Sequence, residues 1–288
     1  MSNSFKFQPV SFSWVAVHPQ PKGVVQFIGG TFFGSLPTLF YRYFLQQLFE
    51  EGYTVVALPF RFTFRHWPIA IGLLKEQEIL RTELTEIAQR LGYESEIYQE
   101  PSSYFWVGHS LGCKYIALLE FLSDDRYPTI VEKFCDRPDY ERIQRLIENL
   151  GIDRPSIKDQ PSLLIAPDIS NTESAIPVRS LAQLLDKFRL GVLPTREQTQ
   201  CFIANSSLFN LTAIISFDRD EIAGSTNDIN KSPEQQKNSD VLWLIQQLSN
   251  RKLPLLRQEI QGKHLEPVGL KIGNYIRHLR KQSKPLCS

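Results

Sequence analysis

Short apolar runs alternate with segments of helical length along most of the chain. Residues 24–28 read Val-Val-Gln-Phe-Ile, a segment of helical length covers 36–51, and residues 53–58 form the next apolar run. This rhythm is typical of an α/β fold, in which a mostly parallel sheet carries helices on both faces. An earlier strand at 12–17 is predicted as an antiparallel edge of that sheet. Further strands are predicted at 104–107, 162–166, 211–217 and 255–260, and further helices at 73–91, 111–122, 140–150 and 234–249.

The segment 168–209 departs from this rhythm. It follows the sixth predicted strand and is long enough for two helices, at 178–190 and 196–208, before the next strand begins. An insertion at this point would lie above the carboxyl ends of the strands, where open α/β sheets bind their ligands. We therefore expect a single α/β domain over residues 1–288, with a helical lid formed by 168–209.

Charge and composition exclude several classes of function. The 288 residues carry 32 basic and 31 acidic side chains, so no overall positive field favours nucleic acid. The four cysteines are far apart and have no histidines at metal-ligand spacing, which argues against a metal site and indicates free thiols in the cytoplasm. No motif implies a cofactor. No apolar run reaches the roughly 18 residues of an integral membrane segment, although peripheral membrane contact through exposed aromatic side chains is compatible with the sequence.

The segment Gly108-His109-Ser110-Leu111-Gly112 joins a predicted strand to a predicted helix. In this context Gly-x-Ser-x-Gly is typical of a nucleophile elbow, a sharp turn that exposes a serine hydroxyl above the sheet. The glycines are needed because side chains there would collide with the strand and the helix, and the helix N-terminus favours developing negative charge. The competing interpretation is that Ser110 only caps the helix. Ser110 is the candidate nucleophile if a base and an acid accompany it.

A serine nucleophile needs a histidine base and an acid that orients the histidine, in the chain order serine, acid, histidine for this kind of fold. The last strand but one is followed by Asp218, Asp220 and Glu221, and the last strand is followed by His264. We predict Asp220 as the acid, because the third residue past the strand end lies on a loop that can reach the histidine. Asp218 is the alternative and Glu221 is third. His264 is preferred as the base over the other four histidines because it follows the last strand.

Two backbone N–H groups are expected to bind the oxygen anion of the acyl intermediate. One belongs to Leu111, the residue after the candidate nucleophile, and the other to the loop after the first parallel strand. Gly30 and Thr31 are the two candidates on that loop, since glycine lets the backbone approach a substrate oxygen. A plain glycine turn after a strand is an equally good interpretation of these residues.

The segments 27–30, 108–112, 217–220 and 262–264 resemble those of the α/β-hydrolase superfamily, and the likeness extends over about residues 24–276. This resemblance implies the roles given above to the serine, the acid, the histidine and the two N–H groups. It also implies a lid between the sixth and seventh strands.

More narrowly, the segments 108–114 and 264–267 are similar to a group of functionally uncharacterised, hydrolase-like proteins of cyanobacteria and plastids. Two positions depart from the wider superfamily. Ile28 lies where many members carry histidine, and Leu58-Pro59 replaces a frequent aspartate. Neither departure removes a catalytic group.

Aromatic side chains crowd two loops that we expect near the candidate nucleophile. Those predicted to line a pocket for an apolar acyl group are Phe32, Phe33, Phe64 and Trp67. Packing of the same rings between the lid and the core is the alternative.

The predicted function is hydrolysis of an ester or thioester, either a lipid or another small molecule with an apolar acyl group. It would proceed through a Ser-His-Asp triad and an acyl-enzyme, as in an esterase, lipase or thioesterase. The alternative from another class is a binding or scaffold protein that keeps the fold without turnover. A third reading is another chemistry on the same fold, such as acyl transfer, C–C bond hydrolysis or cofactor-free halide oxidation.

Overall fold

The computed structural model of the chain describes residues 5–149, 151, 156–169, 191–207, 209, 212–251 and 254–269. Within them, eight strands form one sheet in the order β1-β2-β4-β3-β5-β6-β7-β8. The strands are β1 (Gln8–Val10), β2 (Ser13–Ala16), β3 (Val24–Ile28), β4 (Thr54–Ala57), β5 (Tyr104–His109), β6 (Ser162–Ile165), β7 (Thr212–Phe217) and β8 (Leu256–Ile260). Every neighbouring pair from β4 across to β8 is parallel, which confirms the expected mostly parallel sheet.

An antiparallel pair of strands closes the N-terminal side of the sheet. The expected strand at 12–17 is β2, which is antiparallel to β4, but the edge position is taken by β1. Pro9 suits an edge strand, because it has no N–H to donate to a further neighbour. The turn between the two strands is fixed by Glu76 of the helix α3 (His66–Leu91), whose carboxylate accepts hydrogen bonds from the Ser11 hydroxyl, the Phe12 N–H and the Ser13 hydroxyl.

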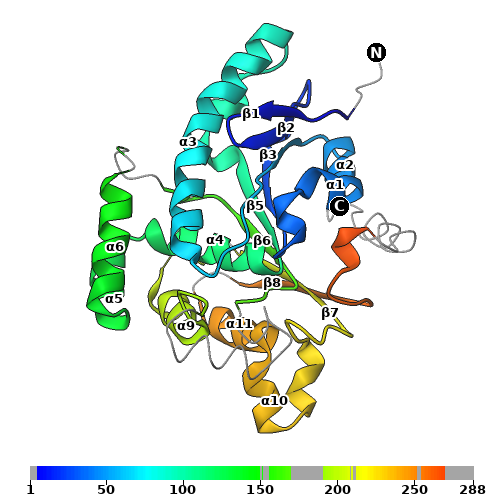
Figure 1. The fold of residues 1–288 in the computed structure, drawn as a ribbon. Helices are drawn as coiled ribbons and strands as arrows, with labels where there is room; N and C mark the ends of the chain where they lie inside the picture. The colour runs from blue at the N-terminus through cyan, green and yellow to red at the C-terminus, as the bar shows by residue number, and fades with distance from the viewer. Residues whose placement is uncertain are drawn as a thin grey trace.

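Helices cover both faces of the sheet (Figure 1). Alternate residues of β3 show why. Val24 and Ile28 belong to one buried cluster with α3 and α4 (Leu111–Leu122), whereas Val25 and Phe27 belong to another with α1 (Pro37–Phe40) and α2 (Arg42–Glu50). Strands buried on both sides read as continuous apolar runs, which is the pattern of the sequence. The helices other than α3 are α1 (Pro37–Phe40), α2 (Arg42–Glu50), α4 (Leu111–Leu122), α5 (Tyr127–Phe134), α6 (Arg137–Glu148), α9 (Arg196–Asn205), α10 (Pro233–Asn238) and α11 (Asp240–Ser249).

Several helix boundaries differ from the sequence-based expectation. Helix α3 begins at His66 rather than at 73, because Pro68 lies in its first turn, where a missing N–H costs no hydrogen bond. The helix expected at 234–249 is split into α10 and α11 by Ser239, whose hydroxyl caps α11 by accepting from the Leu242 N–H. Helix α5 was not anticipated.

The segment 168–209, expected as a lid, is described only in part. Residues 170–190 and the predicted helix at 178–190 lie outside the described residues. The second predicted helix is present as α9, and its Phe202 stacks on Phe121 of α4 with ring centroids 4.5 Å apart. The lid itself stays a prediction. No helix among the described residues is long and apolar enough to span a membrane.

Candidate active site

Ser110 lies between the end of β5 and the start of α4, at the carboxyl edge of the sheet. Its backbone has φ 54° and ψ −123°, a region that few residues other than glycine occupy. Although Ser110 holds the N-cap position of α4, its side chain makes no capping hydrogen bond. The helix-cap interpretation of this serine is therefore not what the structure shows.

The two glycines of the elbow allow α4 to lie against the sheet. A Cβ atom on Gly112 would come within 2.1 Å of the Ile28 carbonyl oxygen, and one on Gly108 within 2.8 Å of the Cys113 nitrogen. Both contacts are with backbone atoms, which cannot rotate away. The glycines thus let the N-terminus of α4 reach the end of β3, which places Ser110 beside the loop after that strand.

His264 links the serine to an acid. Its Nε2 lies 2.8 Å from Ser110 Oγ, and its Nδ1 lies 2.8 Å from Asp220 Oδ2. The carboxylate oxygen can only accept, so Nδ1 carries the proton and Nε2 is left to accept the Ser110 hydroxyl proton. All three residues are buried. We refer to these three side chains as the Ser110–His264–Asp220 chain.

The loop after β7 holds the Asp220 carboxylate in place. Asp220 Oδ1 accepts the N–H groups of Ile222 and Ala223 at 2.8 and 2.9 Å, so only Oδ2 faces His264. The alternative acid, Asp218, turns instead to the loop after β8, where its Oδ1 accepts the Gly262 N–H at 2.8 Å. Asp218 therefore supports the loop that carries His264, and the third candidate, Glu221, is exposed.

The predicted N–H donors Leu111 and Gly30 differ in their hydrogen bonding. Leu111 is the first residue of α4, and the first N–H groups of a helix have no partner within it. The Gly30 N–H already donates to the Tyr41 hydroxyl at 2.7 Å. Gly30 is nevertheless close to the serine, since a Cβ atom on it would lie 3.0 Å from Ser110 Cβ. Because the Gly30 donor is engaged, Thr31 is the candidate that we retain on this loop.

Of the four predicted pocket residues, Phe32 and Phe64 belong to one row of rings, whereas Phe33 and Trp67 pack elsewhere. Phe32 is 60% exposed and its ring lies 4.7 Å from that of Phe62, which in turn lies 5.5 Å from Phe64. These three rings form a row, the Phe32–Phe62–Phe64 row, that starts two residues after Gly30. Phe33 packs on Phe40 instead.

Trp67 is the predicted pocket residue that the structure places elsewhere. Its ring is buried in the core against Phe121 at the far end of α4 and against Phe202. The small pocket that it lines between α3 and α6 has a volume of about 10 Å³, room for about one water molecule. We therefore no longer place Trp67 beside the candidate nucleophile. An aromatic residue type alone does not reveal which side of a helix faces the site.

Two buried charged residues lie at the starts of two helices, Lys114 in the first turn of α4 and Asp240 in the first turn of α11. The Lys114 ammonium group donates to the Pro194 carbonyl at 2.7 Å, and burial lowers the pKa of this group to about 7. Asp240 of α11 accepts from Arg196 Nε at 2.6 Å and from the Ile169 N–H at 2.7 Å. These contacts fix residues 169 and 194–196 to the core. The signal for them in the sequence was Lys114, a charged residue among the apolar residues of the first half of α4.

Cys113 follows the elbow and is fully buried, and burial raises the pKa of its thiol well above the ordinary value. A thiol that keeps its proton is a poor nucleophile. Among the described residues, no cluster of three or more histidine, cysteine, aspartate or glutamate side chains is arranged to hold a metal ion. The polar side chains that meet at the candidate nucleophile are those of His264 and, through it, Asp220.

A hydroxyl that donates to a histidine, itself oriented by a buried carboxylate, is the arrangement needed for nucleophilic attack on an acyl carbon. The helix N-terminus beneath Ser110 and the Leu111 N–H would favour the negative charge that develops on the acyl oxygen. The residues that sequence reasoning missed are Tyr41, His109, Lys114 and Asp240, each of which acts through partners that are distant in the sequence.

The sequence matches one family of proteins, described as "Protein of unknown function (DUF1350)", over residues 6–279. No curated protein matches it.

Solved structures with a similar fold include esterases. The carboxylesterase Cest-2923 from Lactobacillus plantarum is 11% identical, with 91% of this chain and 83% of that chain covered and a TM-score of 0.52. An inhibited esterase B from Lactobacillus rhamnosis is 10% identical, with 95% and 87% covered and a TM-score of 0.52. At these identities the likeness shows the fold alone, which is the α/β-hydrolase fold.

Proposed function

Because the chain belongs to the DUF1350 family, whose function is unknown, we propose a function from its geometry: hydrolysis of a carboxylic ester or thioester with Ser110 as the nucleophile. The observation that carries this proposal is the Ser110–His264–Asp220 chain, in which two contacts of 2.8 Å join side chains from three separate loops. The low-identity likeness to esterase folds is consistent with it.

In the proposed reaction, Ser110 Oγ bonds to the acyl carbon while its proton passes to His264 Nε2. The carbonyl π electrons move to the oxygen, and the resulting anion accepts hydrogen bonds from the N–H groups of Leu111 and Thr31. When the carbonyl re-forms, the bond to the leaving alcohol or thiol breaks and His264 returns the proton to it. Water then attacks the acyl-enzyme by the same route, which releases the acid and restores the Ser110 hydroxyl.

The substrate we propose is a small molecule or lipid with an apolar acyl group. The Phe32–Phe62–Phe64 row supports this choice, because it offers an apolar wall that begins two residues from the Gly30 backbone. We also propose that residues 168–209 act as a lid and that the protein is cytoplasmic. Peripheral membrane contact and kinship with the cyanobacterial and plastid group belong to the same proposal.

A biotinylated fluorophosphonate tests the nucleophile directly, since it bonds covalently to activated serines. We expect the folded protein to be labelled on the tryptic peptide that contains Ser110, and the Ser110→Ala variant to remain unlabelled. Ser102→Ala, a change at an exposed serine before β5, is the matched control and should be labelled like the unaltered protein.

Absence of labelling in the folded, unaltered protein would overturn the proposal in favour of a non-catalytic binding protein. A series of p-nitrophenyl esters from acetate to laurate tests the substrate class. A kcat/KM that rises with acyl length supports an apolar acyl group, and a preference for acetate contradicts it.

A further inference from the structure

The side chain of His109 forms hydrogen bonds with two residues other than Ser110. It is fully buried, and both of its ring nitrogens have partners. Nε2 lies 2.8 Å from the backbone carbonyl oxygen of His264, and Nδ1 lies 2.9 Å from the Tyr41 hydroxyl. Adjacent residues of the elbow thus contact the same histidine. Ser110 bonds to the His264 imidazole, whereas His109 bonds to the His264 backbone carbonyl and packs against its ring, with ring centroids 5.2 Å apart.

The protons in this network have a single consistent arrangement. A carbonyl oxygen can only accept, so His109 Nε2 must carry a proton. Burial lowers the pKa of His109 to about 3, so the ring is neutral and its Nδ1 is an acceptor. The Tyr41 hydroxyl therefore donates to Nδ1, and its oxygen is left to accept the Gly30 N–H at 2.7 Å.

The network therefore runs from the Gly30 N–H through Tyr41 and His109 to the His264 carbonyl. Burial raises the pKa of the Tyr41 phenol well above its ordinary value, so the phenol keeps the proton that it donates. A Cβ atom on Gly30 would lie 3.3 Å from both the Tyr41 oxygen and His109 Nδ1, which shows how closely the loop is seated. The two ends of the network belong to the loops that carry the candidate N–H donor Thr31 and the candidate base.

We propose that Tyr41 and His109 are positioning residues that fix the loop after β3 relative to the loop after β8, and so set where the acyl oxygen is bound relative to the base. This inference rests on the proposed function. Neither side chain forms a hydrogen bond with Ser110 Oγ or with the His264 imidazole. With the Gly30 N–H committed to Tyr41, the neighbouring peptide is held in one orientation, which aims the Thr31 N–H. An N–H fixed in advance costs no reorganisation when the oxygen becomes charged.

The test removes one hydroxyl in each of two buried tyrosines. Tyr41→Phe breaks the network but keeps the ring, whereas Tyr104→Phe removes a hydroxyl that donates to the Tyr98 carbonyl at 2.8 Å at the opposite end of β5. Tyr41→Phe loses two buried hydrogen bonds, and Tyr104→Phe loses one. With p-nitrophenyl butyrate we expect Tyr41→Phe to lower kcat about tenfold with KM within twofold, because the affected interactions matter in the transition state. Tyr104→Phe should also lower Tm but leave kcat within twofold.

A double variant tests whether the two residues act as one unit. Because Tyr41→Phe and His109→Gln each interrupt the same network, the double variant should lose about tenfold in kcat, as each single variant does. Independent effects would multiply to about a hundredfold. Multiplication of the losses, or an effect of Tyr104→Phe equal to that of Tyr41→Phe, would overturn the positioning role.

A measurement without turnover separates this inference from the proposed function. In protein labelled with ¹⁵N-histidine, His109 is expected as the Nε2-protonated tautomer, and Tyr41→Phe should shift the ring signals of both His109 and His264. Unshifted His264 signals would contradict the positioning role even if esters are hydrolysed. Conversely, failure of Ser110 to react with fluorophosphonate would contradict the proposed function, whatever these spectra show.

Discussion

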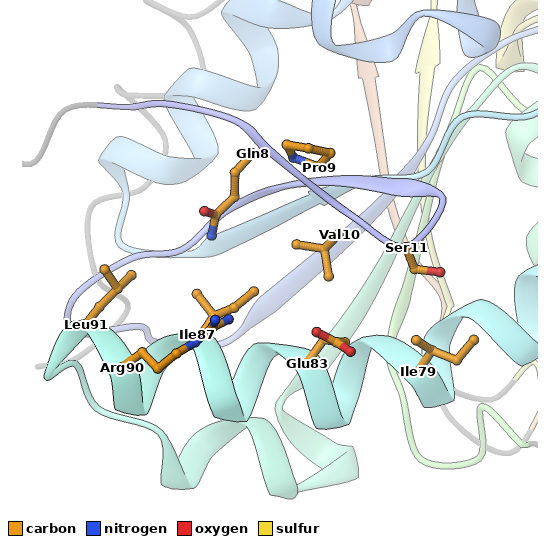
Figure 2. Close-up of a pocket in the computed structure, with 9 residues that line it drawn as sticks. All are labelled: Gln8, Pro9, Val10, Ser11, Ile79, Glu83, Ile87, Arg90 and Leu91. Atoms are coloured by element: carbon orange, nitrogen blue, oxygen red, sulfur yellow. The ribbon is translucent and has the colours of Figure 1, made fainter.

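The candidate site around Ser110 and the groove between β1 and α3 differ in what their side chains do. The groove has a volume of about 620 Å³ and is lined by residues 8–11 and by one face of α3 (Figure 2). Its Ser11 hydroxyl is turned toward Glu76 rather than toward a shared point with Glu83 or Arg90. At the site, by contrast, four polar side chains meet: those of Ser110, His264 and Asp220 in one chain and that of His109 on the His264 carbonyl.

The difference follows from the position of each region in the sheet. The carboxyl ends of β5, β7 and β8 bring three loops to one point, whereas β1 is an edge strand, separated from β5 by β2, β4 and β3. Parallel strands gather their loops at one edge, and an antiparallel edge pair does not. The groove is therefore large although the polar side chains that line it do not converge on one point.

The largest expected effect is a loss of kcat caused by a substitution in the candidate site. Asp220→Asn should lower kcat for p-nitrophenyl butyrate on the order of 10⁴-fold, because an amide cannot hold His264 in the required tautomer. Asp218→Asn makes the same chemical change two residues earlier, and its remaining oxygen can still accept the Gly262 N–H. We expect Asp218→Asn to cost less than about tenfold. A larger loss from Asp218→Asn than from Asp220→Asn would reverse the assignment of the acid.

A second prediction compares the helix of the site with the helix of the groove. Gly112→Ala in α4 should lower the free energy of unfolding by about 3 kcal/mol or more, because the new methyl group would meet the Ile28 carbonyl. Gly72→Ala in α3 adds a methyl group with no atom within 4 Å, and should stabilise the protein by about 0.5–1 kcal/mol. Urea unfolding measures both, and equal effects would show that the elbow is not as tightly packed as described.

Acidification should lower the free energy of unfolding, because His109 takes up a proton more readily in the unfolded chain than in the folded protein. The pKa of His109 is lowered to about 3 in the folded state, while an unfolded histidine titrates near 6.5. The unfolded chain therefore binds more protons between these values, and stability present above pH 6.5 is lost as the pH falls toward 3. His109→Gln should reduce this loss by about 1.4 kcal/mol per pH unit.

The measurement is the free energy of unfolding in urea at several pH values between 4 and 7. Tyr104→Phe, which removes a buried hydrogen bond but no imidazole, is the control and should keep the slope of the unaltered protein. An unchanged slope in His109→Gln would mean that this ring is protonated in the folded state, and the tautomer inferred for it would be wrong.

The smallest effect is expected from the groove. Glu83→Gln and Arg90→Gln remove its charges, and each should leave kcat/KM for p-nitrophenyl butyrate within twofold, since three strands separate β1 from β5. A change of more than about fivefold would break the comparison, because it would show that the groove communicates with the site.

The sequence was informative about positions that follow strand ends. Asp220 and His264 were predicted from their place after β7 and β8, and the structure brings His264 into contact with both Ser110 and Asp220, although their catalytic roles stay predictions. Chain order suffices here, because a parallel sheet places successive loops at one edge. Chain order could not reveal that the Gly30 N–H already has a hydrogen-bond acceptor, since the Tyr41 hydroxyl that accepts from it comes from another part of the chain.

Contacts between elements far apart in the chain were out of reach for the same reason. His109 lies 68 residues from Tyr41 and 155 from His264, and no local pattern encodes such distances. Trp67 was assigned to the pocket by residue type, but its helix begins earlier than expected and turns the ring toward α4 and α9. The periodicity of apolar residues predicts faces of elements, and packing between elements decides which face meets the site.

The shared dependence of Tyr41 and His109 has an evolutionary consequence. A lineage that loses the hydroxyl at position 41 leaves the ring nitrogen at position 109 and the Gly30 amide without partners, and a lineage that replaces the histidine leaves the phenol without an acceptor. Either first step is penalised, so the two positions should be inherited as a pair and change together. Across relatives of this chain, the identity of residue 41 should forecast that of residue 109, although one lies in the turn between two helices and the other in the central sheet.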